Sequence, residues 1–216
     1  MTDLATISYI SIAVAAAICL IIAIDICFNP QKMWVMNLVW PLTALYAGPL
    51  ALILYFKIGR MAASKESAKP FWQSVLTGTL HCGSGCTLGD LIAANLLLYC
   101  PVILFGSHLY GEWVVEYVLA FLIGIAFQYE AIRPMRKLSR PKVLVAALKA
   151  DTLSLTFWQL GMYGWMAICH FLIFDRGLSA SGPVFWLMMQ IGMLFGSLTA
   201  YPVNWWLIRK GIKEAM

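Results

Sequence analysis

The stretch ATISYISIAVAAAICLIIAIDIC, residues 5–27, indicates the fold class, because it is an apolar run about as long as a bilayer is thick. A helix needs about 20 mostly apolar residues to cross the hydrocarbon core. The run shows no alternation of polar and apolar residues, so it predicts a helix and not a strand of a membrane barrel. Only Asp3, and no Lys or Arg, precedes it, which is not the pattern of a secretory signal peptide.

The composition of the whole chain agrees with this run. Of 216 residues, 62% are hydrophobic and only 12% are charged, with a mean hydropathy of +0.80. An ordinary soluble domain is about half apolar and about a quarter charged. These values exclude a water-soluble enzyme, a disordered chain and a nucleic-acid-binding module, so the expected partner is the lipid bilayer and not a nucleic acid.

Five further apolar runs follow, and together they predict an all-α, polytopic membrane protein that forms a single domain over residues 1–216. The predicted spans cover approximately 5–27, 34–56, 84–105, 113–132, 153–174 and 184–208. Residues 57–80 are predicted to form a cytoplasmic loop or a re-entrant entry to the third span. Six spans place 13 of the 15 Lys and Arg residues on one side, with only Lys32 and Arg176 opposite. Cytoplasmic loops carry the Lys and Arg excess, so both termini are predicted to be cytoplasmic.

One segment, TLHCGSGCTLGD at residues 79–90, differs from a simple apolar span. Cys82, Cys86 and Asp90 recur every four residues and would share one face of a helix. Together with His81 they form a ligand set that suits Cu(I) or Zn. The alternative is that the small residues permit close helix packing, with Asp90 capping a helix start. The glycines also allow local unwinding or a re-entrant entry.

Other polar and sulfur-bearing residues are expected at two depths. Glu130, Asp151 and Asn204 are predicted near the cytoplasmic depth of Asp90, where they would form a polar pathway. There are plainer interpretations: Asp151 would cap a helix, and Glu130 would form an ion pair with Arg133. A possible second metal station towards the outer face comprises Met162, Met166, His170, Met189 and Met193. Methionine also fills irregular gaps in apolar cores, which is the alternative for these side chains.

Three stretches carry a resemblance to a known family: residues 80–90, residues 149–156 (KADTLSLT) and residues 201–216 (YPVNWWLIRKGIKEAM). They resemble a bacterial membrane family catalogued as domain of unknown function 4396, over approximately Phe71 to the end of the chain. The resemblance implies a multi-span bacterial membrane protein, and we expect the inner membrane as its location. The family label implies no established activity.

The leading functional hypothesis is binding or transport of a soft transition metal, Cu(I) before Zn, through His81, Cys82, Cys86 and Asp90. Alternatives are a membrane thiol–disulfide oxidoreductase, an ion-coupled transporter of a small solute, and an accessory subunit of a membrane complex. Haem is disfavoured, because only His108 and His170 share a predicted depth. The chain has no Walker-type phosphate loop and no hydrolase or metalloprotease motif, so an enzymatic role is not favoured. A homodimer is compatible with the pattern.

Overall fold

The computed structural model describes residues 2–60, 70–135, 139–175 and 177–215, and within these residues the predicted all-helical fold is confirmed. In this part of the chain, four helices are long and apolar enough to cross a membrane, at residues 3–28, 108–135, 140–173 and 183–209. A further long helix, at residues 71–99, is not among these four. The long helices are α1 (Thr2–Phe28), α5 (Phe71–Tyr99), α6 (His108–Met135), α7 (Arg140–Ile168, extended by the π-helical turn η2, Cys169–Ile173) and α8 (Pro183–Arg209).

The predicted second span, residues 34–56, is not one straight helix. It divides into α2 (Met36–Ala47) and α3 (Pro49–Leu54), and a π-helical turn, η1 (Tyr55–Gly59), continues α3. Gly48 between them has a φ of +49°, which favours glycine, and Pro49 starts the new helix. The chain folds back there, so the rings of Trp40 and Tyr55 meet at 5.6 Å. This segment is a hairpin of two short helices.

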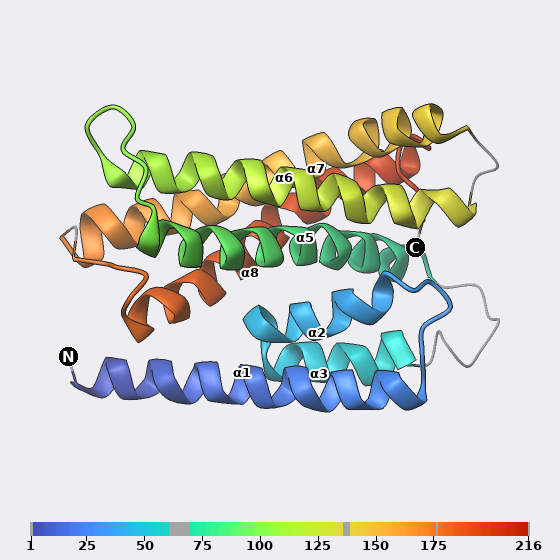
Figure 1. Cartoon of the computed structure of the whole chain (residues 1–216). Helices are drawn as coiled ribbons and strands as arrows, with labels where there is room; N and C mark the ends of the chain where they lie inside the picture. The colour runs from blue at the N-terminus through green and yellow to red at the C-terminus, as the bar shows by residue number, and fades with distance from the viewer. Residues whose placement is uncertain (1, 61–69, 136–138, 176, 216) are drawn as a thin grey trace.

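The hairpin determines at which ends of the molecule the two termini lie. Both of its ends lie at the same end of the molecule, and the two termini therefore lie at opposite ends (Figure 1). The predicted orientation, with both termini cytoplasmic, is not confirmed by this arrangement. The hairpin is joined to the end of α1 by Asp25, which accepts a hydrogen bond of 2.7 Å from the Tyr55 hydroxyl and pairs with Arg60 at 3.1 Å. Of the basic residues used for the orientation, Lys65, Lys69, Arg136, Lys137 and Arg176 lie outside the described residues.

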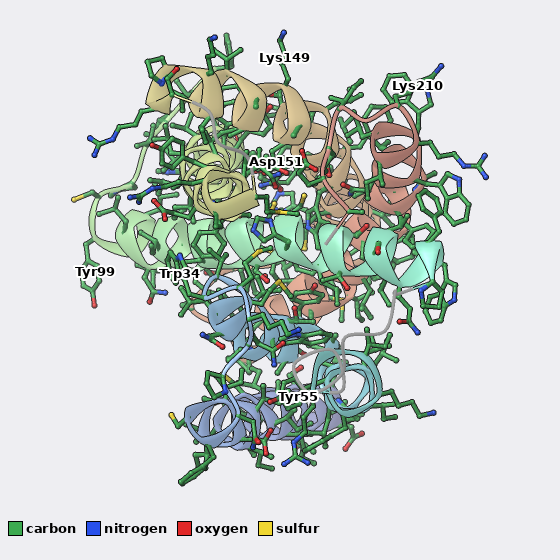
Figure 2. All side chains as sticks on the ribbon, turned by 90° about the vertical axis from the view of Figure 1, so that its right-hand side faces the viewer. Trp34, Tyr55, Tyr99, Lys149, Asp151 and Lys210 are labelled. Atoms are coloured by element: carbon green, nitrogen blue, oxygen red, sulfur yellow. The ribbon has the colours of Figure 1, made fainter. Side chains whose placement is uncertain are left out.

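The helix α5 lies inside the bundle and contacts α2, α6, α7 and α8 (Figures 1 and 2). Its glycines make this close packing possible. A Cβ atom at Gly89 would lie 2.5 Å from the Ala120 Cα, and one at Gly85 would lie 2.8 Å from the Gly124 Cα. A Cβ at Gly83 would enter the ring of Trp158. Local unwinding does not occur, and the glycines act as small residues at a helix interface.

The bounds of α5 also correct the predicted third span at 84–105. The helix begins at Phe71, so residues 71–80 belong to it, and the Cys/Gly/Asp segment lies in its middle and not at its cytoplasmic end. Hydroxyl side chains lower the apparent hydropathy of this part. Thr79, Ser84 and Thr87 each donate a hydrogen bond to the carbonyl four residues earlier. The hydroxyls are satisfied within the helix, which therefore continues through a polar stretch.

Candidate functional site

A cluster of buried polar side chains joins α5, α7, α8 and the C-terminal tail. The Cys82 thiol donates to Asp151 Oδ1 at 2.8 Å and lies 3.1 Å from the Ser154 hydroxyl. Lys213 Nζ donates to Cys82 Sγ at 2.7 Å and to Asp151 Oδ1 at 3.0 Å. Asn204 donates to the Ser154 hydroxyl at 2.7 Å, and all five residues are buried. We call Cys82, Asp151, Ser154, Asn204 and Lys213 the inner cluster.

The tail after α8 brings Lys213 into this cluster. Gly211, with a φ of +67°, turns the chain back, and the amide of Lys213 donates to the Leu207 carbonyl at 3.3 Å. Figure 2 shows Asp151 in the interior among the helices, whereas Lys149 and Lys210 point outward. Burial opposes a charge on Lys213, but Cys82 and Asp151 outweigh it and raise the pKa of Lys213 above its ordinary value. The lysine is therefore charged at neutral pH and forms a buried ion pair.

A second polar contact lies two helical turns further along the bundle. Gln159 donates to Asp90 Oδ1 at 3.5 Å, and Asp90 is only 3% exposed. Cys82 and Asp151 are separated by the same number of residues as Asp90 and Gln159, because α5 and α7 run in the same direction. The predicted face of Cys82, Cys86 and Asp90 is thus turned towards α7. Cys86 itself lies between the two contacts, in an apolar cluster with Leu155, Trp158 and Met162.

The predicted outer station lies within the same apolar core and at its edge. Four methionines of this station are buried in that core: Met162, Met166, Met189 and Met193. Their burial agrees with the alternative interpretation, in which they fill the apolar core. Met166, His170 and Met189 line a hollow of about 20 Å³ together with the carboxylates of Glu112 and Glu116. Glu116 is 4% exposed and lies within electrostatic range of Asp90. The structure thus places acidic side chains beside this station.

Two predicted site residues do not join the inner cluster. The His81 ring is buried and packs edge-on to Phe127 at 6.1 Å between centroids. Glu130 pairs with Arg133 at 3.7 Å and is partly exposed, as the plainer interpretation expected. Among the residues that the structure describes, no three His, Cys, Asp or Glu side chains converge as a metal site would require. Of the predicted polar pathway, Asp151 and Asn204 both lie in the inner cluster. Asp90 lies two helical turns away from it, and Glu130 is not part of it.

Sequence reasoning missed two of the buried charged residues. Glu116 lies within a predicted span, and a lone carboxylate in such a run is itself a signal of function. Lys213 offered no such signal, because it follows the last span among other basic residues that serve the orientation of the chain. Its insertion depends on the turn at Gly211.

These features define a helical membrane-type protein with charged groups buried between its helices. The model of the family described as domain of unknown function (DUF4396) matches residues 71–213, which is more than half of the chain. The chain belongs to this family, as its sequence resemblance implied. The matched region begins at α5 and ends on Lys213, so it contains the complete inner cluster. No curated protein and no solved structure matches the chain.

Proposed function

We propose that the protein is a transporter of the bacterial inner membrane that couples the movement of a small solute to protons. The main support for this proposal is the position of Asp90. Its carboxyl group is buried in the middle of α5 and lines a cavity at the tip of the hairpin of α2 and α3. Ionisable groups inside membrane bundles are costly and mark substrate or proton pathways. Transporter sites commonly lie at discontinuous helices near the bilayer midplane. Asp151 and Glu116 extend the buried acidic groups to either side of Asp90.

The orientation that we propose follows from the hairpin. Lys32 lies between α1 and α2, at the same end of the molecule as the Lys57 and Arg60 end of the hairpin, Arg133 and Lys210. This end is cytoplasmic by the excess of Lys and Arg. The C-terminus is then cytoplasmic, and the N-terminus lies on the outer side, in place of the predicted cytoplasmic position.

Transport is tested with purified protein in liposomes that contain a pH-sensitive dye. External amines, amino acids, sugars and metal ions are added one class at a time. We expect at least one class to change the luminal pH, and Asp90→Asn to abolish that change because an amide cannot exchange a proton. Asp3→Asn is the matched control, since Asp3 is exposed on the first turn of α1. Folded wild-type protein that moves protons with none of these classes would refute the proposal.

Handling of Cu(I) is the second candidate function, and one observation favours it. Sulfur atoms of Cys86, Met162, Met189 and Met193 belong to one buried core cluster, and thiolate and thioether groups prefer Cu(I). Zinc is the alternative metal, although it prefers nitrogen and thiolate ligands. The thiol–disulfide alternative has less support, because Cys82 and Cys86 are completely buried free thiols that a partner protein cannot reach.

The metal hypothesis predicts that protein incubated with Cu(I) under reducing conditions retains about one ion per chain after desalting. Cys82→Ser/Cys86→Ser should lose it, because serine is a poor ligand for this soft ion. Cys27→Ser/Cys100→Ser is the control, since these two thiols are exposed. Elemental analysis measures the copper content, and equal copper in both double variants would reject Cys82 and Cys86 as ligands.

A further inference from the structure

A cavity of about 260 Å³ lies where α1, α2, α5 and α8 meet. Its wall is mostly apolar, with Ala15 and Ala16 from α1 and Met189 from α8. Two aromatic residues also line it: Tyr46, close to the tip of the hairpin, and Trp186, near the start of α8. Pockets for small molecules are typically apolar, with a few placed polar groups. The size and the lining suit a compact ligand with an apolar body.

Asp90 is the acidic group in the lining of this cavity. Its Oδ2 atom is buried and has no hydrogen-bond partner, and its Oδ1 atom accepts only the 3.5 Å bond from Gln159. A buried carboxylate with one long hydrogen bond and no cation nearby is disfavoured as an anion. In the empty cavity the protonated form of Asp90 is therefore favoured, and a cation beside it favours release of the proton.

The nature of that cation follows from the other groups in the wall. A small metal cation such as Ca²⁺ takes 6–8 oxygen ligands, whereas the cavity adds only Thr87, Asn95 and Gln190 to Asp90 as polar side chains beside Tyr46. Gln190 is already engaged, because its amide donates to the Leu45 carbonyl at 2.8 Å and its oxygen accepts from Ser11 at 2.7 Å. Tyr46 and Trp186 contribute aromatic rings to the wall, and aromatic rings attract organic ammonium groups.

We propose that this cavity binds a small organic cation, an ammonium group on a compact apolar body, in exchange for the proton of Asp90. The exchange is balanced: the protonated carboxyl releases one proton, and the carboxylate that forms pairs with the ammonium ion. This inference rests on the proposed transport function and names its class of solute. One carboxylate that serves proton and solute in turn provides the coupling, because both cannot occupy it together.

Other titratable groups near Asp90 come from several elements. Cys86 lies on the same helix, Glu116 on α6 and Tyr163 on α7, while Tyr46 of α2 shares the cavity. The residues of α1 and α8 in the lining carry no ionisable side chain. Glu116 is as buried as Asp90, and two neighbouring carboxyl groups disfavour a charge on each other, so this pair keeps its protons until the ammonium group arrives.

The test uses the purified full chain in detergent, with benzyltrimethylammonium as the probe and benzyl alcohol as its uncharged counterpart. Calorimetry should detect binding of the cation only, with affinity that rises as the pH rises. In weakly buffered solution, about one proton should be released per bound cation. Asp90→Asn should weaken binding by about tenfold or more, because the pairing charge is lost. Asp3→Asn, at an exposed position, should bind as the wild type does.

Wild-type protein that binds the cation without proton release, or equally well at all pH values, would overturn the inference without any variant. Equal binding by Asp90→Asn would also overturn it. If Asp90→Asn does not fold, Tyr46→Leu replaces it, and unchanged binding by that variant counts against the site. Liposome transport of a solute other than an ammonium, without cation binding, would refute this inference alone. Cation binding with proton release but no transport of any class would refute the proposed function and leave the site standing.

Discussion

Lys213→Met should lower the free energy of unfolding by about 3–5 kcal/mol, because it leaves the Asp151 charge buried without its partner. The side chains of Lys213 and Asp151 are both completely buried, and the ammonium group also donates to Cys82 Sγ. Titration with a denaturing detergent, followed by tryptophan fluorescence, measures the change. Lys210→Met is the matched control, because Lys210 is exposed on the same tail and points outward (Figure 2).

A double variant separates the ion pair from the packing of the tail. Lys213→Met/Asp151→Asn removes both charges, so it should recover much of the stability that Lys213→Met loses. The raised pKa of Lys213 sets the pH dependence. A lysine whose pKa is raised on folding stabilises the protein fully below its ordinary pKa of 10.5, and this stabilisation falls as the pH rises through the folded value. Lys213→Met as stable as Lys210→Met would show that no buried pair forms.

Gly89→Ala should be the most damaging single methyl addition on α5. The new Cβ would lie 2.5 Å from the backbone of Ala120, so α5 and α6 must move apart. Overpacking of this kind costs about 1–3 kcal/mol, and a backbone atom cannot give way as a side-chain end does. The same detergent titration measures the loss, and the affinity for benzyltrimethylammonium should also fall because Asp90 follows directly in the chain.

Gly78→Ala on the same helix is the control for helix propensity. The nearest atom to its new Cβ is the end of the Ile208 side chain at 3.7 Å, which is ordinary contact. Alanine is favoured over glycine inside a helix by about 0.5–1 kcal/mol, so this variant should be neutral or slightly more stable. Equal stability of the two alanine variants would contradict the close approach of α5 and α6.

The candidate site was predictable in part. The four-residue spacing of Cys82, Cys86 and Asp90 correctly predicted one helix face, because side-chain direction follows directly from helix geometry. The predicted position of that face, at the end of a span, was wrong, because it lies in the middle of α5. Thr79 and Ser84 lower the hydropathy of this part of the sequence, although their hydroxyls bond within their own helix. The contact between Cys82 and Lys213 was not predictable, because Lys213 lies 131 residues further along the chain.

The sequence alone establishes the helical membrane-type fold and most of the helix positions. Its long apolar runs show no alternation of polar and apolar residues, and in lipid a helix satisfies the backbone hydrogen bonds within each run. The sequence also contains Gly48, where the chain turns. However, the apolar run at residues 34–56 predicts one membrane-spanning helix as readily as a hairpin of two short helices. Packing against α1 and α5 selects the hairpin and thereby sends the termini to opposite ends. The meeting of Lys213, Cys82 and Asp151, and the cavity beside Asp90, likewise depend on contacts between distant segments, which local sequence patterns do not encode.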